Sequence, residues 1–407
     1  MDLENSDLRC LDELLSPISG KELLQQDWGR QFLHVAGPND KFKALFSWNL
    51  LNSALEQNRF EPQRLRLYRG GNEIPSERYL EFPPIQGRNV GRRIKMRGLM
   101  DELRRGSTLI LNYADEISPT LRDLAISLER IFRRYIIANL YIAVGSDNGF
   151  ALHWDDHDTL IVQVSGRKRW LIYEAKSTDP IYAQAPPRPD SNDMPVWDGL
   201  LEEDSLFHIP RGWWHVAYPV NDPSLHLTIT VKSHAGHDML RWVMETLKSS
   251  ALIRGNLPLG ASPEAQEEYV QSLKQLVTQA WPPDLFGQFM DYLDSSASPR
   301  PQLRLPYAAI ASELKMDENT QVKLSSAGRI VLVGAAHEGV VNFKYNGKTK
   351  SCSERLIPAL TLANDGARHA LREFTALGMT PADSVAIGDF VQELIQTGVL
   401  VTEALNV

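Results

Sequence analysis

Two histidines and one aspartate have the residue types and spacing of a metal site. His153 and Asp155 form the chain's one His-x-Asp sequence, and His215 comes much later, just after a Pro-Arg-Gly turn. Residues two apart on a strand point to the same side, so His153 and Asp155 can face one centre, with a third ligand expected from a later, facing strand. Two imidazoles and one carboxylate leave three adjacent positions open on an octahedral Fe(II) ion, as binding of a keto acid and then dioxygen requires.

Other interpretations of these residues stay open at this point. A lone His-x-Asp also arises by chance in surface turns, and Zn(II) usually prefers a closed tetrahedral set of four ligands. His157 lies two residues after Asp155 on the same face, so it is either a donor to a ligand or a rival ligand. Seven of the ten histidines lie between positions 153 and 237, which favours a site in this part of the chain.

The elements that must position these residues are short strands. Between Tyr135 and Ser233 the sequence contains six strand-like runs separated by Gly, Pro, Asn and Asp turns: IIANLYIAV, TLIVQV, KRWLIY, SLFHI, HVAYPV and LHLTITV. Many short strands with such turns predict a β-barrel or jelly roll. Residues 174–203, rich in Pro and Asp, form a longer connection than a normal hairpin loop, either a lid over the barrel mouth or plain surface. Before this segment, residues 46–57 are predicted to be helical and residues 64–70 to be a strand.

Three of these strands carry polar residues on one face and apolar residues on the other. Strict alternation predicts that one face lines a lumen, with these polar members: Asn139, Tyr141, Lys168, His226, Thr228 and Thr230. Lys168 lies in an otherwise apolar row, so it is either a cation at a strand end or the partner of a buried anion. A dicarboxylate would suit this lumen, because Lys168 could neutralise its distal carboxylate while the Tyr141 and Thr230 hydroxyls donate hydrogen bonds.

The sequence predicts two further parts after the strand-rich segment. From His237 to about Pro301 apolar residues recur at helical spacing, and residues 302–407 combine a strand pair with amphipathic helices, which is compatible with a winged helix. Its candidate recognition helix, Ser384 to Gln396, contains Asp389 and Glu393 but no Lys or Arg. We therefore expect no sequence-specific DNA binding.

Composition indicates an ordinary globular protein. The chain has 407 residues, a net charge of −8, 43% hydrophobic and 23% charged residues, and this charge argues against general nucleic-acid binding. Its two cysteines, Cys10 and Cys352, cannot form a disulfide framework and fit a reducing, cytoplasmic setting. The N-terminal sequence lacks the pattern of a signal peptide, and no apolar stretch is long enough to span a bilayer, so no membrane association is expected.

Four segments of the sequence resemble the JmjC-type ribosomal oxygenases, also called the cupin-4 family. They are DWGRQFLHVAGP, GSTLILNYADEISPTLRDL, ANLYIAVGSDNGFALHWDDHDTLIVQVSGRKRW and FHIPRGWWHVAYP, the last followed by SLHLTIT. The resemblance implies a mainly β core, a double-stranded β-helix of the JmjC/cupin type. It also implies helical additions and three domains: a catalytic domain over residues 1–235, a helical dimerisation domain over 236–301 and a winged-helix-like domain over 302–407.

The resemblance also assigns roles to individual residues. It implies that His153, Asp155 and His215 hold Fe(II) and are the catalytic centre, and that 2-oxoglutarate is bound by four residues: Lys168, Tyr141, Asn139 and Thr230. With O2, such a site would hydroxylate an Arg or His side chain of a protein or peptide substrate, of which a ribosomal protein is the leading candidate, and the enzyme would be a homodimer. Two alternatives stay open: a hydroxylase of a small molecule or precursor peptide, and a non-catalytic metal-binding cupin module.

Overall fold

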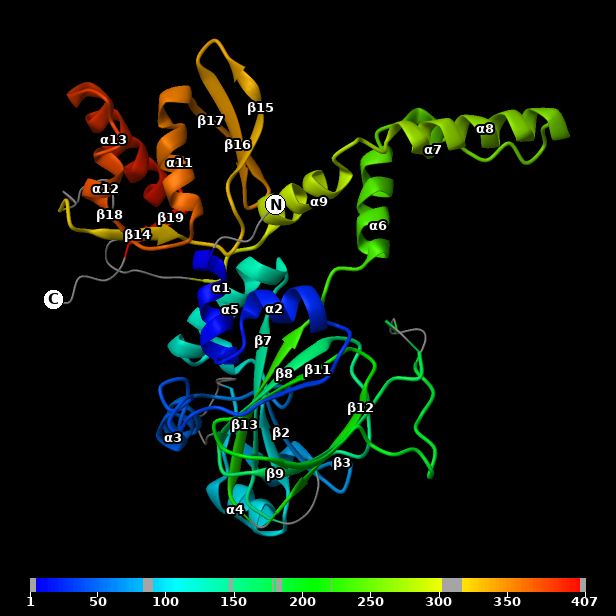
Figure 1. Ribbon diagram of the computed structural model, residues 1–407, viewed down its shortest axis with the longest axis vertical. Coiled ribbons are helices and arrows are strands. Elements are labelled where there is room, and N and C mark those ends of the chain that lie inside the picture. The colour runs from blue at the N-terminus through cyan, green and yellow to red at the C-terminus, as the bar shows by residue number, and fades with distance from the viewer. Residues whose placement is uncertain are drawn as a thin grey trace. The chain divides into compact units, whose positions relative to one another are not determined.

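The computed structural model describes residues 5–82, 91–145, 149–177, 179–180, 185–220, 222–301 and 317–402 (Figure 1). The chain divides into two compact units. One spans Asp7–Ser233, and the other spans His234–Val407 together with the first six residues. The predicted division into three domains is finer than this one and stays a prediction.

Two antiparallel sheets form the core of the first unit. The larger has eight strands in the order β1 (Leu33–Val35), β11 (Leu206–Ile209), β8 (Asp158–Ser165), β13 (Ser224–Val231), β7 (Ile137–Ala143), β6 (Thr108–Leu111), β2 (Leu65–Arg69) and β3 (Asn72–Glu73). The smaller has the order β10 (Trp197–Leu201), β9 (Lys168–Tyr173) and β12 (Trp214–Pro219). Buried side chains from both sheets form one cluster, among them Ile161, Phe207, Trp170 and Leu201. The two sheets therefore enclose a common interior, as in a double-stranded β-helix.

The alternation of β13 explains its central position in the larger sheet. Leu225, Leu227, Ile229 and Val231 are fully buried on one face, and each such side chain stabilises the fold by about 2 kcal/mol. The other face carries His226, Thr228 and Thr230, which line a cavity. One strand thus holds the core together with one face and builds the site with the other.

Helices and short elements lie before and between the first strands of this unit. They are α1 (Asn5–Leu15), α2 (Gly20–Glu22), the π-helix η1 (Leu23–Asp27), α3 (Trp48–Gln57), η2 (Ser76–Arg78), the pair β4 (Leu80–Glu81) and β5 (Arg93–Ile94), α4 (Met96–Arg104), η3 (Ala114–Glu116) and α5 (Pro119–Phe132). Helix α5 begins where the Ser118 hydroxyl accepts a hydrogen bond from the Leu121 N–H and Pro119 occupies the first turn. The predicted helix at 46–57 and strand at 64–70 are confirmed as α3 and β2.

The second unit begins with four helices: α6 (Gly236–Leu247), α7 (Ala251–Arg254), α8 (Pro263–Gln279) and α9 (Leu285–Ser296). After residues 302–316, which lie outside the described residues, come β14 (Gln321–Leu324), β15 (Val331–His337), β16 (Val340–Tyr345), β17 (Lys348–Ser353), η4 (Glu354–Leu356), α11 (Ile357–Asn364), β18 (His369–Ala370), α12 (Leu371–Thr375), α13 (Pro381–Gln396) and β19 (Leu400–Thr402). Phe343, Phe374 and Phe390 anchor one core beneath α11 and α13. The predicted strand pair is β15 with β16, and β17 extends it to a three-stranded sheet.

Candidate active site

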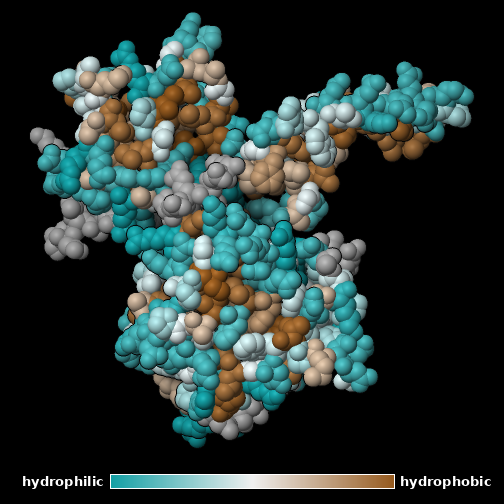
Figure 2. All heavy atoms as spheres, viewed as in Figure 1, coloured by the Kyte–Doolittle hydropathy of each residue, from teal (hydrophilic) through white to brown (hydrophobic). Residues whose placement is uncertain are grey.

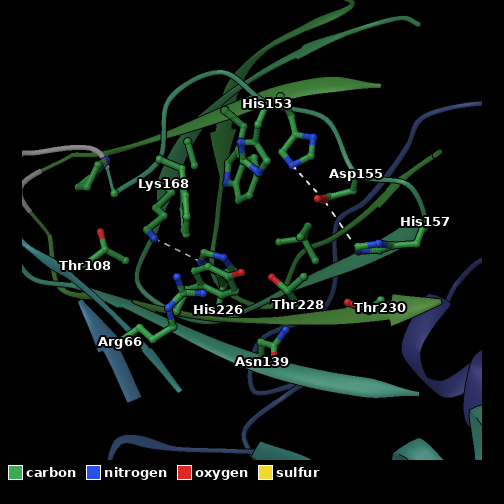
Figure 3. A pocket seen from close by; sticks show the side chains of 18 residues that line it. Arg66, Thr108, Asn139, His153, Asp155, His157, Lys168, His226, Thr228 and Thr230 are labelled. Atoms are coloured by element: carbon green, nitrogen blue, oxygen red, sulfur yellow. Dashed lines mark hydrogen bonds and ion pairs between the residues drawn. The ribbon is translucent and has the colours of Figure 1, made fainter. Parts of the chain in front are cut away.

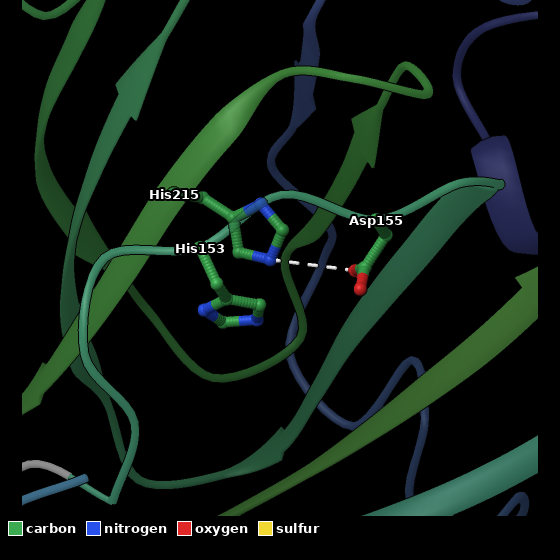
Figure 4. A group of neighbouring side chains, drawn as sticks. All are labelled: His153, Asp155 and His215. Carbon is green, nitrogen blue, oxygen red and sulfur yellow. Dashed lines mark ion pairs between the residues drawn. The ribbon is translucent and has the colours of Figure 1, made fainter. Parts of the chain in front are cut away.

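Three side chains converge on one point inside the first unit. His153, Asp155 and His215 each offer a ligand atom, and these atoms all lie within 4.8 Å of one another. The two imidazole ring centres are 4.4 Å apart, and His215 Nε2 lies 3.5 Å from Asp155 Oδ2 (Figure 4). Distances of this size allow one ion to contact all three groups.

Backbone hydrogen bonds hold the two ligand-bearing segments together. The His153 N–H donates to the His215 carbonyl at 3.1 Å, and the His215 N–H donates to the His153 carbonyl at 2.8 Å. The Gly212 N–H donates to the Asp155 carbonyl at 2.9 Å. Gly212 has φ +85°, a conformation that favours glycine, so the Pro-Arg-Gly turn suits this close approach. We refer to these three hydrogen bonds as the ligand bridge.

Carbonyl groups orient both imidazole rings. His153 Nδ1 lies 2.9 Å from the Ala151 carbonyl, and His215 Nδ1 lies 3.1 Å from the Trp213 carbonyl. Because a carbonyl only accepts, each Nδ1 carries the hydrogen and each Nε2 keeps a lone pair for a metal. Burial, followed by the neighbouring His153, lowers the pKa of His215 to about 4, so this ring is neutral at pH 7.

A cavity of about 310 Å³ opens beside the three side chains (Figure 3). All seven residues that the sequence assigns to the site line it, and so does His157. The full lining is Arg66, Thr108, Asn139, Tyr141, Gly149, Phe150, His153, Asp155, His157, Ile161, Lys168, Trp170, His215, Ala217, Pro219, His226, Thr228 and Thr230. The structure therefore brings together the residues singled out from the sequence, while their individual roles stay predictions.

Lys168 is a buried cation site in this cavity. It is 3% exposed, and burial lowers the pKa of its ammonium group to about 7. Its Nζ lies 3.4 Å from His226 Nδ1, and no described acidic side chain forms an ion pair with it. On β9, Lys168 lies four residues from Ile172, and Ile172 pairs with His215 on β12. Four residues of a strand span about 13 Å, which separates Lys168 from the level of His215. Figure 3 shows Lys168 and Asp155 entering the cavity from different sides.

Tyr141 and His226 form the floor between these groups. They are directly opposite on β7 and β13, and their rings stack at 4.9 Å with an angle of 4°. Burial raises the pKa of Tyr141, so its hydroxyl stays protonated and can donate. Burial and the nearby Lys168 lower the pKa of His226, so its ring is neutral.

Asn139 and His157 both line the cavity, and each has a polar partner outside the converging group. Asn139 lines the cavity, but its side-chain oxygen accepts a hydrogen bond from the Tyr113 N–H at 3.1 Å, so its amide group is partly engaged. His157 Nδ1 lies 3.0 Å from Asp156 Oδ1, and its Nε2 is 4.0 Å from Asp155 Oδ2. His157 is not a member of the converging group, so it neighbours Asp155 without sharing the centre.

Arg66, Thr108 and Phe150 also line the cavity and were not predicted from the sequence. Arg66 lies on β2 between the buried Leu65 and Leu67, and its Nε donates to Glu73 Oε1 at 2.9 Å. The signal was present, because β2 alternates apolar and polar residues as β7 and β13 do. Thr108 and Phe150 carried no comparable signal in the sequence.

The two-sheet architecture and its converging His-Asp-His group have counterparts among known proteins. Residues 118–239 match the family model of the JmjC domain, and this part of the chain is a JmjC domain. The ribosomal oxygenase YcfD from Escherichia coli shares the fold, with a TM-score of 0.55, 15% identity, and coverage of 95% of this chain and 98% of that chain. The same protein in complex with cobalt and 2-oxoglutarate also gives a TM-score of 0.55. The predicted JmjC/cupin β core with helical additions is confirmed.

The chain is also similar to several proteins that share one name. The chain is 26% identical to the bifunctional lysine-specific demethylase and histidyl-hydroxylase NO66 of Drosophila mojavensis, over 68% of this chain and 33% of that protein. The protein of the same name from Drosophila yakuba is 23% identical over 97% of this chain and 64% of its own length. The chain therefore spans between one third and two thirds of the length of these relatives.

Proposed function

We propose that this chain is an Fe(II)- and 2-oxoglutarate-dependent oxygenase that hydroxylates a side chain of a protein substrate. The observation that carries the proposal is the pairing of two features in one cavity. One is an open set of two imidazoles and a carboxylate, and the other is a buried lysine without an acidic partner among the described residues. Neither feature alone distinguishes a catalytic centre from a structural one.

The donor set fits Fe(II). His153, Asp155 and His215 would hold the ion through two Nε2 atoms and one carboxylate oxygen, which leaves positions for a chelating acid and for O2. The Ala151 and Trp213 carbonyls keep both rings in the ligating tautomer. A four-ligand structural zinc site would need another His, Cys or carboxylate at this point, and the described residues supply none.

The far side of the cavity fits a short dicarboxylate. Lys168 would pair with the distal carboxylate, while the Tyr141 and Thr230 hydroxyls donate hydrogen bonds and Asn139 lines the wall. A carboxylate placed here would favour the charged form of Lys168 and reverse the effect of burial on its pKa. The complex of YcfD with cobalt and 2-oxoglutarate supports the identity of this acid.

Together, Fe(II), 2-oxoglutarate and O2 supply the oxidising chemistry, and the protein supplies binding and position. His153, Asp155 and His215 fix the location of the reaction, and Lys168 fixes the orientation of the cosubstrate. The stacked rings of Tyr141 and His226 would cover the floor of the cavity. A target carbon must then be presented from the open side, close to the three ligands.

The names of similar proteins support a proposal for the substrate class. Those names include a histidyl-hydroxylase and a ribosomal oxygenase, which supports a protein substrate, a ribosomal one first, and an Arg or His target. Mass spectrometry of the host proteome with and without this protein tests the proposal. We expect one peptide to lose an oxygen-sized mass increment when the protein is absent. A proteome without such a change would instead favour a small-molecule substrate.

Catalysis itself is tested by succinate release from 2-oxoglutarate in the presence of Fe(II). The His153→Ala variant serves as the negative control, because it removes one ligand from the converging group. If the wild-type protein released no succinate from 2-oxoglutarate in the presence of Fe(II), the non-catalytic cupin alternative would be favoured.

Binding of 2-oxoglutarate is expected to weaken as pH rises above about 7. The pKa of Lys168 is lowered to about 7, so the cation is present below this pH and must be regained by proton uptake above it. The dissociation constant should be flat below pH 7 and rise by up to about tenfold per pH unit above it. Calorimetric titrations between pH 6 and 9 with saturating metal measure this slope. In Lys168→Arg, which stays charged throughout, the slope should disappear, and a slope that persists there would contradict the assignment.

We also propose that helices α6 to α9 mediate a homodimer. Helix α8 has no buried residue, and Val270 on it is 53% exposed. Figure 2 shows hydrophobic side chains gathered along one side of the α7 and α8 region. We expect light scattering to give a dimer mass for the wild type and a monomer mass for Val270→Glu, because a charge is costly in an apolar interface. A monomeric wild type would contradict this proposal.

We propose a cytoplasmic location for this protein. None of the described helices is long and apolar enough to cross a membrane. The sparse cysteines, both free in the structure, support a cytoplasmic location.

A further inference from the structure

A second carboxylate, Asp158, lies beneath the ligand bridge and does not face the cavity. It is 3% exposed at the start of β8. Its Oδ2 accepts a hydrogen bond from the Ser233 hydroxyl at 2.8 Å, and its Oδ1 accepts one from the Arg211 N–H at 3.3 Å. A buried carboxylate with two donors from distant parts of the chain ties those parts to one position.

The Ser233 side of this arrangement extends into the N-terminal segment. The Trp28 indole N–H donates to Ser233 Oγ at 3.0 Å, and the Trp28 ring stacks on His208 at 4.6 Å. His208 Nδ1 in turn lies 3.0 Å from the Gln31 carbonyl. These contacts connect Ser233 to the N-terminal segment, so Asp158 is linked on one side to packed groups.

The Arg211 side reaches the metal ligands. Arg211 is followed by Gly212, whose N–H donates to the Asp155 carbonyl as part of the ligand bridge. Two consecutive N–H groups of this turn therefore have partners in one short segment. The Arg211 N–H donates to the Asp158 carboxylate, and the Gly212 N–H donates to the Asp155 carbonyl. His215 lies three residues beyond Gly212, so the position of this turn sets the distance between the Asp155 and His215 side chains.

We propose that Asp158 is a positioning residue for the metal centre: its carboxylate holds the Arg211–Gly212 turn so that Asp155 and His215 fit one ion. The inference rests on the proposed function, because it concerns the same metal. It goes beyond that function by assigning roles to Asp158, Ser233 and Trp28, which do not line the cavity. It also accounts for the Trp28 segment, which the oxygenase activity by itself leaves unexplained.

Titration of the purified full-length protein with Co(II) alone tests the proposal. Asp158→Ala should weaken Co(II) binding by about 10-fold to 100-fold, the range typical for groups that orient metal ligands, and should change the visible absorption spectrum of bound Co(II). The spectrum reports ligand geometry, which a loss of stability alone would not alter. Ser233→Ala, a milder change that keeps the carboxylate, should shift affinity in the same direction by a smaller factor and serves if Asp158→Ala does not fold.

Asp204 provides a matched control. It is also a buried carboxylate, 5% exposed, and it accepts backbone hydrogen bonds from Asp40 at 2.7 Å and Phe42 at 2.9 Å, away from the ligand bridge. Asp204→Ala should lower Tm while Co(II) affinity and spectrum stay as in the wild type. If Asp158→Ala and Ser233→Ala behaved like this control, the positioning role would be refuted. A wild type that bound no Co(II) would overturn the proposed function and this inference together.

Discussion

Replacing Asp155 with asparagine is expected to lower 2-oxoglutarate turnover by at least about 100-fold. The loss of groups that merely orient ligands typically costs 10-fold to 100-fold, and the loss of a ligand should cost more. The amide keeps the size of the side chain and the Gly212 hydrogen bond, which uses the backbone carbonyl. The fold should therefore survive while the charge that holds Fe(II) is lost. Succinate release and Fe(II) binding measure the effect.

Asp156 supplies the control for this variant, because it is the next residue of the same loop. Its carboxylate pairs with Lys232 at 2.9 Å and is not part of the converging group. Asp156→Asn should keep turnover within about twofold, since an exposed ion pair contributes little. Equal losses in both variants would mean that the loop, and not the Asp155 ligand, limits activity.

Replacing Lys168 with methionine is expected to raise the KM for 2-oxoglutarate by about 100-fold. A buried carboxylate that loses its charged partner costs about 3 kcal/mol, which corresponds to roughly two decades in affinity. The rate at saturating cosubstrate should fall much less, because the metal ligands are unchanged. Since burial already disfavours the charged lysine, methionine should not lower Tm. Steady-state kinetics and a melting curve separate the two effects.

Lys232→Met is the matched control for charge removal. The Lys232 side chain is 61% exposed and pairs with Asp156 outside the cavity. The KM of the Lys232→Met variant for 2-oxoglutarate should stay within about twofold of the wild-type value. An unchanged KM in Lys168→Met would show that the acid does not contact this lysine, and the assignment of the cavity would then fail.

Much of the β core could be predicted from local pattern. The runs that became β7, β8, β9, β11, β12 and β13 are rich in β-branched and aromatic residues and end at turn residues. The strand β10 was missed, because Trp197–Leu201 lies in a stretch dominated by Pro and Asp, and it is a strand through its pairing with β9. Part of residues 174–203 is thus sheet and not a long loop. Tertiary pairing decided this element, and local sequence does not report such pairing.

Site residues were predictable where the alternation of polar and apolar residues along their own strand determines the face to which their side chains point. Tyr141, His226 and Thr228 could be placed on one face from alternation alone, and they line one cavity. The two residues that were missed without any signal, Thr108 and Phe150, come from segments outside this pattern. Phe150 reaches the cavity through a loop, and its ring lies 5.6 Å from that of His153. Such placements depend on how distant segments pack together, and no period in the sequence encodes them.

The ligand bridge has a consequence for how the protein would respond to its metal supply. Asp155 and His215 belong to segments that are far apart in the chain and meet edge to edge at the bridge. An ion bound by both acts as a reversible cross-link that exists in the native state alone. At a free concentration one hundred times its dissociation constant, such an ion adds about 2.7 kcal/mol to the free energy of unfolding. If the bound ion is iron, as proposed, iron scarcity would shorten the lifetime of the protein, because a loosened bridge exposes backbone to proteases.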